Sequence, residues 1–269
     1  VAVTQNTNAF NIGRKVVSDP HWVDTINLYR SGSLASKPIL SSEALSLIDS
    51  ISPDDELRKI LEHRTQELIE YQNLSYAKEY MSFVGNIFEK EQKTRSSSEL
   101  SQNVAKYLFK LMATKDEYEV ARLSLKAELD SAINKEFGKS AKISYMLHPP
   151  FLKAMENIPI LNMLPGVKSK LALGSWFKIF YVMLKNMKFL RGTIFDFMAW
   201  FSNDVRKADK KALDHYKHVI MKNIDEIGNG KYQDLKDFSV LPDIIRGYEE
   251  VRLETMTEFY QKSDNLFKS

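Results

Sequence analysis

Two histidines three residues apart, His215 and His218, have the spacing of metal ligands on one face of a helix. Together with the adjacent Asp214 they could hold a zinc or iron ion, which is the basis of one hypothesis, a free-standing metalloenzyme. Four lysines crowd the same stretch and would repel a cation: Lys210, Lys211, Lys217 and Lys222. We therefore interpret the segment as a solvated helix face and predict no metal site.

An acidic run is the second feature that could do chemistry, because residues 115–119 read KDEYE. In the first turn of a helix these carboxylates would offset the positive end of the helix dipole. Glu119 would also pair with Lys115 and Arg122, each pair contributing about a few tenths of a kcal/mol. The alternative is an acidic patch on a docking surface. The spacing favours the first interpretation.

The most apolar stretch, residues 171–190, is interrupted by Lys178, Lys185 and Lys188. These charges argue against a membrane span, which needs about 20 nearly uncharged residues. The stretch could lie on a membrane surface or meet a partner. We expect instead a nearly buried helix whose lysines reach out to water along their aliphatic stems.

Composition excludes several classes of function. The 269 residues include no cysteine, which excludes disulfides, thiolate zinc sites, cysteine-ligated iron–sulfur clusters and a cysteine nucleophile. A net charge of +3 and the absence of a basic–aromatic pattern argue against nucleic-acid binding. There is no glycine-rich phosphate loop and no Gly-x-Ser-x-Gly elbow. The absence of cysteine fits a reducing compartment, so we predict a cytoplasmic location.

The elements that must position these residues are helices, since ten glycines and eight prolines leave long uninterrupted stretches. We predict a mainly α, multi-helix domain with at most a short strand or hairpin near 142–147. A lone strand needs a partner, which we expect in another chain or another domain. The predicted helices span 5–17, 21–30, 42–50, 53–72, 75–94, 98–113, 115–137, 151–157, 175–190, 204–227 and 240–266.

Several residues are typical of helix ends. Ser52 is expected to cap the helix that follows it, and Thr114 and Glu117 have the spacing of a capping box. Gly138 is expected to end the helix over 115–137, and Gly228-Asn229-Gly230 fits a helix end and turn. The segments 31–41 and 158–174 are expected to be a linker and an irregular connection.

Residues 107–123 read YLFKLMATKDEYEVARL. This run resembles the KLMAYKDEYEVARL run in the C-terminal domain, of unassigned function, of the indolepyruvate:ferredoxin oxidoreductase family. A helix pattern of that domain, R-x-x-x-L-x-x-Y-Q-x-x-x-Y-A-x-x-Y, is matched between Arg64 and Tyr80. Three further stretches agree in order: His148-Pro149-Pro150, Leu190-Arg191-Gly192-Thr193 and Pro242-Asp243-Ile244-Ile245-Arg246-Gly247.

The resemblance implies a part of an enzyme rather than a complete one. The family oxidatively decarboxylates aryl 2-oxoacids with thiamine diphosphate, coenzyme A and a low-potential electron acceptor, and binds its cofactors and iron–sulfur clusters in domains upstream of this region. The resemblance therefore implies an accessory, structural or interaction region with no catalytic, cofactor or metal residue of its own. The positions that it marks, as family-motif or interdomain residues, are Lys115, Asp116, Glu117, Tyr118, Glu119, Arg122, Arg191 and Arg246.

The resemblance also implies a domain division. Residues 1–19 resemble the tail helix of a preceding gamma-type catalytic domain, and 20–269 form the helical accessory domain. The expected partners are the upstream catalytic domains, a homodimer partner and an electron-carrier protein. The alternatives are a helical protein–protein interaction domain, or a docking module for an electron carrier or coenzyme A that uses Lys178, Lys185, Lys188 and Arg191.

Overall fold

The computed structural model describes residues 39–138, 143–147, 171–196, 198–199 and 203–267, with positions 7, 10–11, 13–15 and 17–19 near the start. The chain separates into two compact units, Val1–Ile39 and Leu40–Ser269. In the first unit the described positions from 7 to 18 are helical, as expected for 5–17. The helices predicted over 21–30 and 151–157 lie outside the described residues. The division between residues 19 and 20 stays a prediction.

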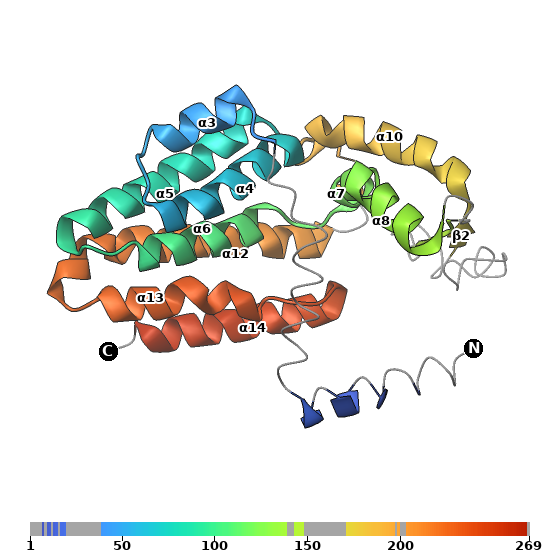
Figure 1. Cartoon of the computed structure of the whole chain (residues 1–269). Coiled ribbons are helices and arrows are strands. Elements are labelled where there is room, and N and C mark those ends of the chain that lie inside the picture. The colour runs from blue at the N-terminus through green and yellow to red at the C-terminus, as the bar shows by residue number, and fades with distance from the viewer. Residues whose placement is uncertain are drawn as a thin grey trace. The chain divides into compact units, whose positions relative to one another are not determined.

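The second unit is the mainly α, multi-helix domain that the sequence predicts (Figure 1). Most of its helices form one group, here called the bundle, which contains the larger core. Its α-helices are α3 (Ser42–Asp49), α4 (Asp55–Tyr71), α5 (Leu74–Thr94), α6 (Glu99–Met112), α12 (Asn203–Asn223), α13 (Tyr232–Val240) and α14 (Glu249–Leu266). Two 3-10 helices, η4 (Ile224–Asn229) and η5 (Leu241–Ile244), connect the last three.

The bundle forms because its helices present apolar residues every three or four positions. On α6 the side chains of Leu100, Val104 and Leu108 are fully buried, and they contribute to one continuous apolar core. The start of α6 is completed by Glu91 of α5. This buried carboxylate accepts hydrogen bonds from the backbone N–H groups of Leu100 and Ser101, at 3.0 and 2.8 Å. A side chain from another helix thus satisfies N–H groups that a helix start leaves open.

The remaining elements form a second group, here called the outer layer. Its helices are α7 (Glu117–Ser124), α8 (Ala127–Phe137), η2 (Ser175–Phe177), α10 (Lys178–Asn186) and η3 (Met187–Leu190). It has a small core of its own, made by Tyr118, Ala121, Phe177, Tyr181 and Leu184. In Figure 1, α7, α8 and α10 extend beyond the bundle, on the side away from α13.

The outer layer also contains the predicted strand. β1 (Tyr145–Leu147) pairs antiparallel with β2 (Leu171–Leu173), with Tyr145 opposite Leu173. The prediction that the strand finds its partner in another chain or domain is therefore wrong. The partner lies in the stretch that we expected to be irregular. β2 was not predicted, because three residues show little of the alternating pattern of a strand.

Two predicted helix starts are shifted. α4 begins at Asp55 with Asp54 as its N-cap, and the Asp54 carboxylate accepts from Leu57 N at 2.9 Å, so Ser52 does not cap it. α7 begins at Glu117 with Asp116 as its N-cap, so Thr114 does not open a capping box. In both cases an aspartate nearer the helix supplies the acceptor, and a charged acceptor also interacts favourably with the helix dipole.

Other boundaries differ where a tertiary contact or a glycine interrupts the pattern. The helix predicted over 115–137 divides at Lys126, which is extended and whose ammonium reaches Glu67 of α4 at 2.5 Å. The helix predicted over 240–266 is interrupted at Gly247, which has φ +83°. α13 was not predicted. Gly138 and Gly230 do end their helices, as predicted.

Candidate functional site

Six of the eight residues that the resemblance marks meet where α4, α7, the segment after η3 and α12 come together. Five of the six belong to a network that we call the arginine junction, which consists of three arginines and the carboxylates bonded to them. Its members are Arg122, Arg191, Arg206, Glu67, Glu70, Asp116, Glu117, Glu119 and Asp196. Tyr118 belongs to the same region through a hydrogen bond to Asp196.

Arg191 joins the start of α7 to the end of α4. Its guanidinium donates two hydrogen bonds to Asp116, at 2.5 and 2.9 Å, and a third to the carbonyl oxygen of Tyr71 at 2.6 Å. The guanidinium carbon lies 3.8 Å from the centre of the Tyr71 ring, which adds a cation–π contact. Burial lowers the pKa of Arg191, but the hydrogen bonds and charge of Asp116 outweigh it, so the pKa lies above its usual value.

Arg122 makes the second connection to α4. It donates two hydrogen bonds to Glu119, at 2.8 and 2.9 Å, and further ones to Glu67 at 2.5 Å and Glu70 at 2.6 Å. Its side chain is only 5% exposed, so these bonds lie largely out of water. Burial raises the pKa of Glu67, but hydrogen bonds from Lys126 and Arg122 outweigh it and leave the pKa below its usual value.

Arg206 connects the junction to α12. It donates to Asp196 at 2.9 Å and to Glu117 at 2.6 Å. Asp196 is nearly fully buried and also accepts from the Tyr118 hydroxyl at 2.9 Å and from Gly192 N at 3.0 Å. Burial, together with the hydrogen bond to Asp196, raises the pKa of Tyr118, so its phenol stays protonated.

Sequence reasoning found only part of this network. The helical pair Glu119–Arg122 is confirmed, and Asp116 and Glu119 are nearly buried, at 7% and 8% exposure, so they do not form an acidic docking patch. Four members were not predicted: Glu67, Glu70, Asp196 and Arg206. Each lies on a segment remote in sequence from its partner, and an isolated charged residue carries no signal of a distant ion pair.

The other two marked residues, Lys115 and Arg246, line a cleft of about 400 Å³ beside the junction. Lys115 is exposed, whereas Arg246 pairs with Asp243 at 2.6 Å. Deeper in the cleft Asp209 pairs with Arg252, and burial raises the pKa of Asp209. Both acidic and basic side chains line the cleft, so its lining as a whole does not carry a single sign of charge.

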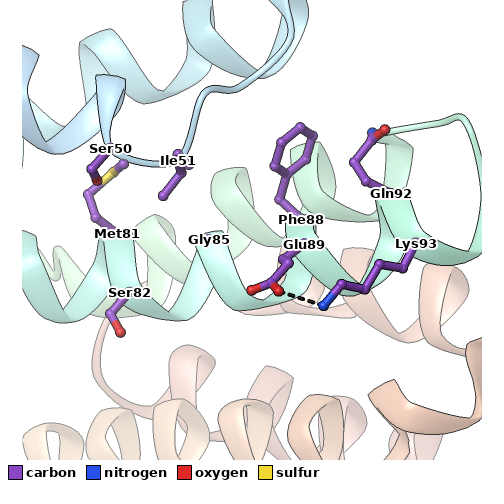
Figure 2. A pocket seen from close by; sticks show the side chains of 9 residues that line it. All are labelled: Ser50, Ile51, Met81, Ser82, Gly85, Phe88, Glu89, Gln92 and Lys93. Carbon is purple, nitrogen blue, oxygen red and sulfur yellow. Dashed lines mark hydrogen bonds and ion pairs between the residues drawn. The ribbon is translucent and has the colours of Figure 1, made fainter.

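A second groove, of about 590 Å³, lies between the end of α3 and one face of α5 (Figure 2). Ile51 reaches α5 at Gly85, where a Cβ atom would lie 2.7 Å from an Ile51 methyl carbon. Met81 and Phe88 contribute the apolar lining, and the exposed ion pair between Glu89 and Lys93 lies at the edge of the groove. Glycine at this position lets α3 approach α5 closely, so the groove is a consequence of packing rather than a set of convergent reactive groups.

The two histidines, His215 and His218, lie in different environments. His215 contacts the rings of Phe259 and Tyr260 and lies 2.8 Å from the Ser263 hydroxyl, while His218 is exposed. Burial lowers the pKa of His215. Within the part of the chain that the structure describes, no group of three or more His, Asp or Glu residues could hold a metal ion.

The expectation that residues 171–190 form a nearly buried helix is wrong. Ile179 of α10 is 78% exposed, while Tyr181 and Leu184 face inward. Of the proposed docking cations, Lys178 pairs with Asp130 at 2.8 Å and Arg191 belongs to the junction. No helix among the described residues is long and apolar enough to cross a membrane.

The geometry of the arginine junction is that of binding between segments of the chain. Each carboxylate in it accepts from a guanidinium at 2.5 to 2.9 Å, so the arginines link segments of the chain through charge-assisted hydrogen bonds. Arginine is suited to linking segments in this way because its planar guanidinium group can donate to two carboxylates at once.

Comparison with known proteins agrees with the extent of this domain. Residues 57–265 match a family of unknown function, DUF6537, and this range runs from α4 to α14 and contains the whole junction. Neither the curated proteins nor the solved structures include a match to the chain. Since the matched range covers well over half of the sequence, the chain belongs to the family of unknown function DUF6537.

Proposed function

We propose that this chain is an accessory, structural domain of a cytoplasmic indolepyruvate (aryl 2-oxoacid):ferredoxin oxidoreductase, without an active site of its own. The observation that carries the proposal is the convergence of separate stretches of the resemblance on one junction. Arg191, from the Leu190–Thr193 stretch, donates to Asp116 of the 107–123 run and to Gln72 of the Arg64–Tyr80 pattern, the last at 2.8 Å.

This convergence offers a physical reason why these stretches occur together. Residues scattered over more than a hundred positions agree with one family pattern, and here they contact one another. Such a set is expected when the shared property is a fold, because contacting residues depend on each other for their energy. The resemblance therefore supports a common domain rather than a chance match of one run.

The same contacts support an accessory role. In the run 116–122 every charged group, Asp116, Glu117, Glu119 and Arg122, takes part in holding α7 against its neighbours. In the proposed enzyme, thiamine diphosphate and iron–sulfur clusters are bound by other domains. This domain would pack on them, or on a dimer partner, and maintain their arrangement.

A calorimetric titration tests the proposal. The 269-residue chain, verified as folded by circular dichroism, is titrated with thiamine diphosphate and, separately, with coenzyme A. We expect no binding heat from either ligand. Saturable binding of thiamine diphosphate to this chain would overturn the proposal.

A second measurement uses the complete polypeptide encoded by the reading frame. We expect it to bind thiamine diphosphate and to reduce a viologen dye when indolepyruvate and coenzyme A are added. The variant Arg122→Met is expected to lower the temperature at which this activity is lost, with the Michaelis constant for indolepyruvate unchanged. A complete polypeptide without thiamine-diphosphate binding would contradict the proposed parent enzyme.

A further inference from the structure

The outward side of α10, together with η2 and η3 at its two ends, exposes a row of large apolar side chains, here called the α10 face. Its members are Trp176, Ile179, Val182, Met183 and Phe189, exposed by 65, 78, 48, 47 and 68%. In Figure 1, α10 runs along the outer edge of the domain above α7. Monomeric proteins rarely expose such a concentration of large apolar groups, which makes this face a candidate interface.

The small core of the outer layer does not include these residues. The inward side of α10 packs through Tyr181 and Leu184 against α7, and the Phe177 and Tyr181 rings meet edge to face at 4.9 Å. A helix that is apolar on its outward side as well as its inward side is typical of one covered on both. The outward residues therefore indicate a second covering surface.

The charges around the α10 face indicate the charge of the surface that would cover it. The described residues 171–195 contain no Asp or Glu, and four Lys or Arg. Lys185 is exposed beside the apolar row. Burial, followed by the nearby cations Arg122 and Arg191, lowers the pKa of Lys188. A complementary surface has an apolar centre and carboxylates at its edge.

A permanent protein partner satisfies these conditions better than the other occupants. A second copy would bring Lys185 near another Lys185 with no acid from this stretch to offset it. Transient electron-carrier contacts are small, whereas a face dominated by Trp, Ile and Phe is typical of permanent interfaces. A membrane surface would attract exposed cations, yet Lys178 is paired with Asp130 and Lys188 donates inward to the Glu70 carbonyl oxygen at 2.6 Å.

We infer that the α10 face docks permanently against the catalytic part of the proposed oxidoreductase, with a carboxylate of that part opposite Lys185. The inference rests on the proposed function, since that function supplies the partner. It adds the surface through which the domain is attached and the chemistry of the surface that receives it.

Cysteine labelling tests the inference, because the chain has no cysteine and a single one can be introduced. Ile179→Cys places it on the α10 face, and Val251→Cys, at a position 55% exposed on α14, is the matched control. Each variant is treated with N-ethylmaleimide, as the isolated chain and within the complete polypeptide, and modification of the labelled peptide is followed by mass spectrometry. Thermal melts of both variants confirm that they fold.

We expect both cysteines to react readily in the isolated chain. In the complete polypeptide, Ile179→Cys should react at least about tenfold more slowly, as in a stable protein interface, and Val251→Cys at an unchanged rate. Lys185→Glu should restore much of the reactivity of Ile179→Cys there, because it places like charges opposite each other. Equal rates for Ile179→Cys in both forms would overturn the inference.

Other occupants give different results, each of which would also overturn it. A second copy would protect the isolated chain as its concentration rises, and a membrane would be indicated by protection with phosphatidylglycerol vesicles alone. A transient carrier would be indicated if only ferredoxin protected, and only at low salt. Full activity with an unprotected Ile179→Cys would overturn this inference and leave the proposed function standing. Protection in a polypeptide that binds no thiamine diphosphate would overturn the proposed function alone.

Discussion

The bundle and the outer layer are held together by different forces. The bundle has a continuous apolar core to which each of its α-helices contributes, and its buried carboxylate Glu91 completes a helix start. Among its described side chains the outer layer has a core of five buried apolar or aromatic residues, and the arginine junction attaches it to α4 and α12. One region depends on the amount of apolar surface removed from water, and the other on a few charge-assisted hydrogen bonds.

The difference follows from how much surface each region can bury. Burial contributes about 25 cal/mol per Å² of apolar surface, so a small cluster supplies little stability by itself. Hydrogen bonds between charged groups are directional and contribute about 1.5–3 kcal/mol each, so a few of them can fix a short helix in place. Because these hydrogen bonds fix the outer layer without burying both sides of α10, one apolar side of α10 stays exposed. A layer held by core packing would have buried it.

Leu108→Ala is expected to have the largest effect, because this fully buried side chain lies in the core of the bundle. Removing it should lower the free energy of unfolding by about 2–5 kcal/mol. The loss should be the same at low and high salt, since no charge is involved. Urea unfolding at both salt concentrations measures it, with the exposed Val251→Ala as the control. A strong salt dependence would contradict the view that apolar packing holds the bundle.

Arg122→Met is expected to weaken the outer layer selectively, by about 3 kcal/mol, because it leaves the nearly buried Glu67 and Glu119 without their guanidinium. Hydrogen exchange should become faster in α7 and α10 and stay slow in α6. Arg122→Lys keeps the charge but loses the fork, so it should give an intermediate effect. Uniform acceleration over all helices would show that the two regions do not differ in this way.

His215→Asn is expected to have the smallest effect, and it concerns pH. Burial lowers the pKa of His215 in the folded protein, so the unfolded chain binds the proton more tightly. The stability that this neutral histidine contributes is therefore complete above its unfolded pKa of about 6.5 and is lost as pH falls below it. Unfolding midpoints between pH 7.5 and pH 5 should decline less in His215→Asn than in the unchanged protein. An identical decline would mean that other groups, such as His63, account for it.

The helical class and most helix positions could be predicted because they depend on local patterns. α4, α5 and α6 begin and end within two residues of the predicted limits, since their apolar periodicity is long and uninterrupted. α13 and β2 could not be predicted in this way. A helix of nine residues and a strand of three carry at most a weak periodic signal, and they depend on the surfaces that they cover.

The candidate site shows the same division. Family resemblance marks Asp116, Arg122 and Arg191 in the sequence, but it does not say that they lie together. Their partners Glu67 and Arg206 carry no local signal, because an ion pair between distant segments exists only after the segments have packed.

The sequence by itself therefore determined the helical class, the absence of cysteine chemistry and the family-like run at 107–123. The tertiary structure alone decided that four charged residues of this run, Asp116, Glu117, Glu119 and Arg122, lie in an ion-pair network, and that α10 turns an apolar face outward. The physical reason is that periodicity records that a helix has an apolar side, whereas burial and ion pairing depend on which segments come to lie against it.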